Sequence, residues 1–327
     1  MGYGQTKLDI LNIIMKRTLL LIALLFCSTI VFGQGSPDKH GVYFGIGGNV
    51  FCGDLGGGGK DAAHFLGVRD INTSSFRPAL QLGYSYKLYP NLAVRAGVMW
   101  LRVYGSDTET TCASRKARNL NFRSDILSFG AHLDYYLLKE REIPRYASSS
   151  MMAANRFAVY FTVGFSMFHF NPQGELDGQW YDLQPLCTEG QGTSFTYEKK
   201  NGSGSQPYTT LSAPYKLLAA EIPFGFGVKY QINKKLSLCL EGAYHVTTTD
   251  YIDDCSSNYF NWDESGFTPP SELTTQFADR RINTDGSKAS PAKTGEKRGN
   301  SGYNDAFVTF IVTAHYRISS RHGRHSR

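Results

Sequence analysis

The stretch Ala306–Ile318, AFVTFIVTAHYRI, decides the fold class. Its even-numbered side chains are all apolar or aromatic, whereas the odd-numbered ones include threonines, His315 and Arg317. A period of two indicates a β-strand with two different faces. The stretch is longer than the roughly five or six residues of an average globular strand, and it is long enough for a tilted transmembrane strand of about 9–11 residues.

Seven further segments show the same alternation, each with one apolar or aromatic face. They are 42–51, 76–89, 92–104, 122–138, 157–170, 218–230 and 236–247. Long connections (53–75, 105–121, 171–214 and 251–303) alternate with shorter ones (90–91, 139–155 and 231–234). Outer-membrane barrels have short periplasmic turns and long outer loops. The sequence therefore predicts an all-β fold, an eight-stranded antiparallel up-and-down transmembrane β-barrel with long extracellular loops, located in the outer membrane.

Tyrosines near one end of the apolar faces support a membrane setting. They are Tyr84, Tyr86, Tyr135, Tyr230 and Tyr316. Aromatic girdles of this kind lie where a bilayer meets water. The alternative is a soluble β-sandwich with its apolar faces inside. Strand length, the tyrosines and the alternating connections together favour the membrane barrel.

The composition excludes several other classes of protein. Aromatic residues make up 13% of the chain and charged residues 19%, with a formal net charge of +6. The charged fraction is below the roughly 25% of soluble domains, and the apolar content is too high for a disordered chain. The positive charge is modest and scattered, so we expect no nucleic-acid partner.

The first 33 residues are not expected to belong to the fold. Residues 15–33 have the charged, apolar and small-residue regions of a secretory signal peptide, and 1–14 precede its start. A lipid anchor at Cys27 is disfavoured because the bulky Phe26 precedes it. The barrel domain then spans 34–318, and 319–327 form a basic C-terminal tail.

The predicted inner faces carry ionisable groups. An eight-stranded barrel is narrow enough for side chains to fill, so these groups are expected to form a packed polar plug rather than a channel, a binding site or a proton path. The predicted lumen network consists of Arg77, Lys87, Arg95, His132, Asp134, Glu221, Lys229, Glu241, His245, His315 and Arg317.

Two motifs that suggest ligand binding are weak. Residues 56–60, GGGGK, lack the spacing of a phosphate-binding loop. The acidic residues Asp250, Asp253, Asp254, Asp263 and Glu264 could supply oxygen ligands to calcium, but without EF-hand spacing a solvated acidic loop is the favoured interpretation. We expect no metal, no cofactor and no small-molecule substrate.

Cysteine and histidine side chains are the remaining candidates for reactive groups. Cys112, Cys187 and Cys255 fall in loops on the same side, so a loop disulfide among them is plausible in an exported protein. Cys239 is expected to point inward as a small inert side chain. His169 has no serine near it on its face, which disfavours the nucleophilic chemistry of a lipid-modifying barrel enzyme. The protein is therefore not expected to be an enzyme.

Several loop and strand-edge motifs resemble one family. In chain order they are GDLG at 53–56, RNLNFRSD at 118–125, NP at 171–172, QPL at 184–186, TEGQG at 188–192, IPFGFGVKY at 222–230, TDYIDD at 249–254 and RGN at 298–300. Together they resemble the PorG-like outer-membrane barrels associated with type IX secretion, over about residues 42–318. Cys187 and Cys255 depart from the family pattern, and the tail extends past its usual end.

The resemblance implies an accessory role in type IX secretion, in which the barrel attaches the periplasmic lipoprotein ring complex to the outer membrane. Outer-membrane lipid and that ring are the implied partners. The connection 139–155 and the basic tail would be the docking surface. The alternatives are a surface-exposed binding or structural barrel with functional loops, and a lipid-modifying outer-membrane enzyme.

Overall fold

The computed structural model describes residues 39–55, 73–110, 112–139, 156–201, 204–283 and 285–318, and His40–Ile318 form one compact unit. The predicted signal peptide, the glycine-rich segment 56–60, most of the connection 139–155 and the tail 319–327 lie outside the described residues. Within the described part, no helix is long and apolar enough to cross a membrane.

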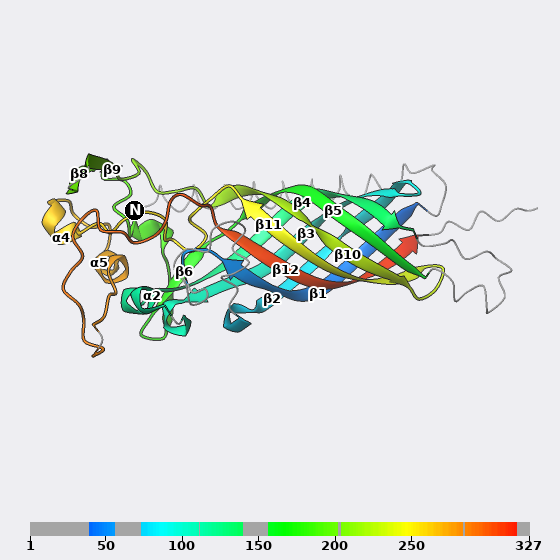
Figure 1. Cartoon of the computed structure of the whole chain (residues 1–327), viewed down its shortest axis with the longest axis horizontal. Coiled ribbons are helices and arrows are strands. Elements are labelled where there is room, and N and C mark those ends of the chain that lie inside the picture. The colour runs from blue at the N-terminus through cyan, green and yellow to red at the C-terminus, as the bar shows by residue number, and fades with distance from the viewer. Residues whose placement is uncertain are drawn as a thin grey trace, which may run out of the picture. The chain divides into compact units, whose positions relative to one another are not determined.

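Eight long strands form a closed antiparallel barrel (Figure 1). They are β1 (His40–Cys52), β2 (Arg77–Tyr89), β3 (Leu92–Ser106), β4 (Asn121–Leu138), β5 (Phe157–His169), β10 (Leu218–Gln231), β11 (Leu236–Thr247) and β12 (Ala306–Ile318). Each strand pairs with its neighbour in the chain, and β12 pairs with β1 to close the ring. The predicted fold class is confirmed, and the predicted strands differ from the observed ones by at most two residues at an end.

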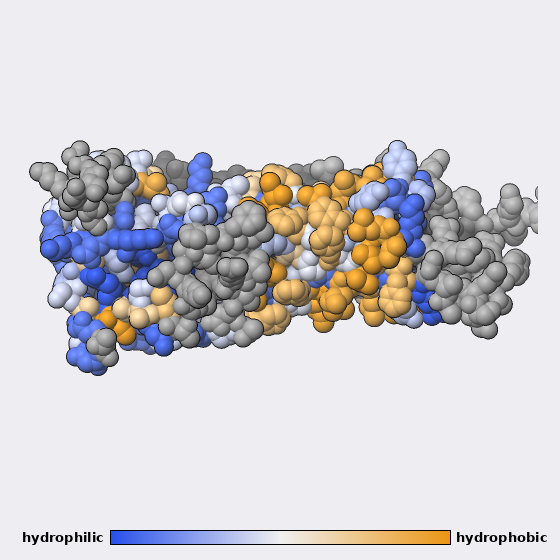
Figure 2. Space-filling view, in the orientation of Figure 1, coloured by the Kyte–Doolittle hydropathy of each residue, from blue (hydrophilic) through white to orange (hydrophobic). Residues whose placement is uncertain are grey.

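The outside of the barrel is apolar at mid-height (Figure 2). Every strand contributes to this belt at least one apolar side chain that is 43–60% exposed. These are Phe44, Leu82, Val98, Phe129, Phe165, Phe226, Leu240 and Phe310. A closed barrel pairs all of its strand edges, so its backbone needs no water where it crosses hydrocarbon. This is the construction of a transmembrane barrel of the outer-membrane type.

The five predicted girdle tyrosines all lie toward the end of the barrel that carries the short turns. Tyr84 and Tyr316 are both paired with Val42 near the start of β1, and Tyr135 is paired with Leu92 at the start of β3. Tyr135 and Tyr316 remain exposed there. They mark the edge of the apolar belt nearest the short turns.

The opposite end carries a folded cap, which we define as the described residues of the four long connections: 53–76, 107–120, 170–217 and 248–305 (Figure 1). Its elements are η2 (Thr73–Ser75), η3 (Asp107–Glu109), α2 (Ala113–Arg118), β6 (Pro172–Leu176), β7 (Gln179–Asp182), η4 (Gln184–Leu186), β8 (Thr196–Asn201), β9 (Gly204–Thr209), α4 (Trp262–Ser265) and α5 (Glu272–Ala278). The cap has apolar clusters of its own, one around Phe260 and Trp262 and one around Leu183 and Phe277.

An apolar cluster fills the barrel where it meets the cap. Phe51, Leu101, Phe122, Phe168 and Phe307 all belong to it and are almost completely buried. The interior is therefore largely apolar at the loop end, which the sequence did not predict. This cluster closes the loop end of the lumen.

Candidate functional site

The middle of the lumen is built around Arg95 on β3. Its Nε lies 2.7 Å from Oδ2 of Asp134 on β4, and its Nη2 donates to Oε2 of Glu241 on β11 at 2.7 Å. The hydroxyl of Tyr160 on β5 donates to the same Glu241 oxygen at 2.6 Å. Arg95 is only 2% exposed, so this network ties four strands together in the buried interior.

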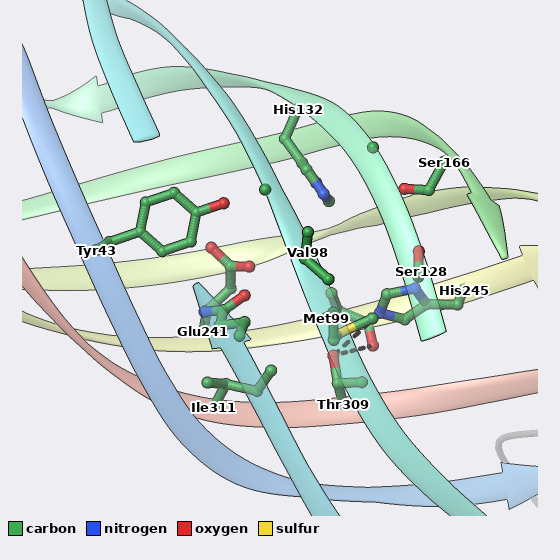
Figure 3. A pocket seen from close by; sticks show the side chains of 14 residues that line it. Tyr43, Val98, Met99, Ser128, His132, Ser166, Glu241, His245, Thr309 and Ile311 are labelled. Carbon is green, nitrogen blue, oxygen red and sulfur yellow. Dashed lines mark hydrogen bonds between the residues drawn. The ribbon is translucent and has the colours of Figure 1, made fainter. Parts of the chain in front are cut away.

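A second interior cluster, of Thr309, His245 and Glu221, resembles a catalytic triad in its order of contacts; Figure 3 shows its Thr309 and His245. Nε2 of His245 lies 3.1 Å from the Thr309 hydroxyl, and its Nδ1 lies 3.2 Å from Oε2 of Glu221. Ser128 also donates to Glu221, at 2.7 Å. The adjoining cavity measures about 20 Å³, which is the room of a single water. The cavity leaves room beside Thr309 for nothing larger than a water.

The remaining members of the predicted network are distributed differently. His132 lines the small cavity, and His315 stacks on Tyr43 with ring centroids 5.2 Å apart. Arg77 does not join the network, because its guanidinium lies 4.0 Å from the ring centroid of Tyr104 and donates to backbone carbonyls at the loop end. The three members nearest the turn end of the barrel are Lys87, Lys229 and Arg317.

The cap contains a second charged network, which the sequence did not predict. Arg118, at the end of α2, forms a two-pronged ion pair with Asp107, with N–O distances of 2.7 and 2.8 Å. It also donates to the backbone carbonyl of Asp54 at 2.6 Å and to that of Arg298 at 2.8 Å. A single buried side chain thus joins the first, second and fourth long connections.

Arg298 completes this network from the other side. Its Nη1 donates to Glu189 at 2.9 Å, and its Nη2 lies 3.7 Å from Oδ2 of Asp254. Asp254 also accepts hydrogen bonds from the Thr188 and Tyr215 hydroxyls, at 2.6 and 2.7 Å. We call the residues around Arg118 and Arg298 the cap knot; they are Asp54, Asp107, Glu189, Asp253 and Asp254.

The residues that carry the PorG-like resemblance converge on this knot. Asp54, Arg118, Glu189, Asp254 and Arg298 come from five separate motifs and are all at the same buried place. No local pattern identifies such a meeting point, because it depends on how four loops fold over one another. Charged residues beside glycine in the loops, as in TEGQG and RGN, are the signal that could have directed attention to it.

Of the acidic residues in the last loop, Asp250, Asp253 and Asp254 are buried, so the expectation of a solvated loop was wrong for them, whereas Asp263 and Glu264 are exposed. Asp253 and Asp254 are at most 1% exposed. Burial raises the pKa of Asp54, Asp253 and Asp305, and it raises that of Asp250 to about 9. The described residues hold no group of three or more histidine, cysteine, aspartate or glutamate side chains arranged for a metal ion.

These carboxyls make the stability of the cap depend on pH. Burial raises the folded-state pKa of Asp250 far above its ordinary 3.8, so its stabilising contribution is complete below about pH 4 and is lost as pH rises through about 9. We expect amide exchange in the cap to accelerate between about pH 4 and about pH 9 beyond the intrinsic chemical rate. The Asp250→Asn variant should show a smaller acceleration.

The matched control for that experiment is Asp285→Asn. Asp285 is fully exposed, and its hydrogen bonds to Ser287 lower its pKa. Its titration therefore ends below this pH window, and its variant should follow the wild type. Identical pH profiles for Asp250→Asn and the wild type would contradict a role for Asp250.

The predicted loop disulfide does not form. Cys187 and Cys255 are both free thiols, so no two of the three loop cysteines are joined. Cys187 packs in the cluster around Phe260, whereas Cys255 belongs to the cluster at the barrel mouth, with its sulfur 3.5 Å from Arg118. Cys187 and Cys255 therefore lie in different clusters and do not meet. The sulfur of Cys112 lies 3.0 Å from the Ser114 hydroxyl within its own loop. Cys239 is buried in the interior.

No protein-family model matches the sequence, and no curated protein matches it significantly. Solved structures with a similar course of the chain include Neisserial surface protein A, at 9% identity, covering 85% of this chain and 96% of that one with a TM-score of 0.34. Ail of Yersinia pestis, in complex with a heparin analogue, has 8% identity, coverages of 85% and 97% and a TM-score of 0.33. OprG of Pseudomonas aeruginosa has 12% identity, coverages of 88% and 99% and a TM-score of 0.32. Likeness at this level carries no functional argument, and the PorG-like resemblance stays a prediction from sequence motifs.

Proposed function

We propose that this chain is a non-enzymatic outer-membrane barrel that serves type IX secretion as an accessory component, by attaching the periplasmic ring complex to the membrane. The observation that carries the proposal is the filled interior. Arg95 and its two carboxylate partners occupy the middle of the lumen, and the apolar cluster around Phe122 occupies its loop end. A barrel without a pore is suited to anchoring other proteins rather than to conducting solutes.

The absence of a role in lipid chemistry is part of the same proposal. The Thr309 and His245 side chains line a cavity of about 20 Å³ inside the barrel, and Glu221 is buried beside His245, so this cluster does not face the bilayer. His169, the outward-facing histidine near the loop end, is exposed and follows the buried Phe168 on β5. An unchanged lipid A profile in a strain that lacks the gene is the expected result.

Deletion of the gene tests the secretion role. We expect the deletion strain to lose secretion of type IX cargo and to regain it when the full chain is supplied. Variants that lack 140–155 or 319–327 should insert in the membrane but recover less of the ring subunits in pull-downs. Normal secretion in the deletion strain, or full ring recovery by both shortened variants, would contradict the proposal.

A surface-binding barrel is the second candidate, and the ordered cap favours it. Two apolar clusters and the cap knot give the cap a folded core, which loops with a purely connecting role do not need. Normal cargo secretion in the deletion strain, together with a change in adhesion or in surface binding, would support this candidate over the first.

A further inference from the structure

A cavity of about 550 Å³ opens in the cap, beside the buried knot. Its wall comes from the third and fourth long connections and includes Gln191, Tyr251, Ser257, Asn258, Lys297 and Ser301. The volume lies in the range of about 300–1,000 Å³ that is typical of sites for small ligands. The cavity belongs to the part of the molecule whose surface is mostly hydrophilic (Figure 2). It shares no lining residue with the small cavity of the barrel interior.

One wall of this cavity holds a polar group that lacks a partner. Gln191 is 3% exposed, and its Oε1 accepts a hydrogen bond from the backbone N–H of Glu189 at 3.0 Å. That bond fixes the orientation of the amide. Among the described residues, its buried Nε2 has no acceptor. Buried donors in native proteins are almost always paired, so this donor is available to a ligand oxygen.

The charges around the cavity indicate which kind of ligand group would accept a hydrogen bond there. Glu189 supplies the carboxylate of the lining, and Arg298 and the Ser257 hydroxyl already engage it, at 2.9 and 2.6 Å. Lys297 reaches the lining from an exposed position. The other polar groups are hydroxyls and amides, which both donate and accept. Such a wall matches the hydroxyl groups of a ligand better than a strongly charged group.

The cavity also has an aromatic wall on a rigid base. Tyr251 stacks on Tyr215 with ring centroids 4.4 Å apart and an interplanar angle of 12°, and Tyr215 stacks in turn on Phe170. The hydroxyl of Tyr215 is held by Asp254 in the cap knot. The aromatic wall is therefore positioned by the same network that folds the cap. Amphipathic ligands with apolar C–H faces and many hydroxyls suit a wall of this composition.

We propose that this cavity binds a short segment of a polyhydroxylated, largely uncharged carbohydrate. Gln191 donates through Nε2 to a ligand hydroxyl or ring oxygen, the serine and asparagine side chains complete the polar contacts, and Tyr251 lies against the apolar face of a sugar ring. The carbohydrate comes either from the cell's own surface polysaccharide or from free oligosaccharides of the surroundings. This site is independent of attachment to a periplasmic ring, because it lies in the cap.

Titration of the full chain in micelles tests the proposal. Lauryldimethylamine oxide is a suitable detergent because its head group contains no sugar. The probes are maltotriose, cellotriose and chitotriose in one arm and polysaccharide released from the cell's own outer membrane in the other, with binding followed by saturation-transfer NMR and calorimetry. We expect at least one probe to bind. Binding in the second arm identifies the cell's own polysaccharide as the source, and binding in the first arm alone identifies free oligosaccharides.

Three variants test whether the carbohydrate binds in this cavity. Ser301→Trp fills the cavity from an exposed rim position and should weaken binding at least tenfold. Ser114→Trp introduces the same side chain at an exposed position on α2, outside the cavity, and should bind as the wild type does. Gln191→Glu keeps the oxygen that accepts from Glu189 but removes the donor, and it should also weaken binding at least tenfold.

The mobility shift on heating verifies that each variant still forms a barrel, and protease resistance verifies the cap. If Gln191→Glu fails to fold, Ser301→Trp still decides the matter, because an exposed serine contributes little to folding. Failure of all probes to bind overturns the proposal. Equal affinity of Ser301→Trp and the wild type for a probe that binds overturns it as well.

Discussion

Replacing Arg95 with leucine is expected to lower the free energy of unfolding of the barrel by about 3–5 kcal/mol. The substitution leaves Asp134 and Glu241 buried without the cation that lies 2.7 Å from each of them. An unpaired charge in a dry interior is costly, because neither water nor another charge replaces its partner. Urea titration of the barrel in lipid bilayers, followed by tryptophan fluorescence, measures the loss. The temperature of the mobility shift on a gel should fall in parallel.

Two further variants separate the charge effect from a general loss of packing. The ion pair of Arg102 with Asp125 has the same 2.7 Å distance, but its side chains are 36% and 46% exposed. Arg102→Ala should therefore cost about 1 kcal/mol or less. Replacing Arg95, Asp134 and Glu241 together with apolar residues should recover much of the stability, since no buried charge then remains. A cost for Arg95→Leu as small as that of Arg102→Ala would contradict the interior network.

Replacing Arg298 with leucine is expected to destabilise the cap by about 3–5 kcal/mol while the barrel persists. Glu189 and Asp254 would lose the guanidinium that lies 2.9 and 3.7 Å from them in the buried knot. The strands do not depend on this residue, because their hydrogen bonds run between neighbouring strands around the ring. We therefore expect faster amide exchange and faster proteolysis in the connections 170–217 and 248–305, with an unchanged mobility shift for the barrel.

Lys297→Leu is the matched control, one position away in the same loop. Lys297 is exposed, so its replacement should change cap stability by no more than about 0.5 kcal/mol. If Arg298→Leu left cap proteolysis at the rate of Lys297→Leu, the knot would not hold the cap together. If it also abolished the mobility shift, the cap and the barrel would not be separable units of stability.

The strands of the barrel could be predicted because their information is local. Alternation along β12 and the long runs around Phe129 and Phe226 specify a strand and its lipid-facing side without reference to any other segment. Arg95, Asp134 and Glu241 followed from the same pattern, since inward parity in a narrow barrel brings opposite charges together. The prediction that Arg77 belongs to this network was wrong, because at the loop end its long side chain lies against the ring of Tyr104.

The cap was missed because its organisation is not periodic. Its helices and strands are short, and its buried charges meet across large sequence separations, such as the 109 positions between Glu189 and Arg298. The acidic run at 250–254 has the composition of a solvated loop. Its burial depends on partners that the fold supplies. The backbone N–H groups of Leu55 and Cys255 donate hydrogen bonds to Asp253, and Arg298 lies beside Asp254.

The sequence by itself determined the closed barrel, its membrane-facing belt and the polar character of its interior, because a two-residue period fixes which side chains share a face. Only the tertiary structure decided that the lumen is closed at the loop end, that residues from five separate sequence motifs meet in one buried knot, and that a polar cavity lined by Gln191 opens beside it. The physical reason is that buried charges and donors are satisfied by whichever loops fold over them, and this pairing is a property of the whole fold rather than of any segment.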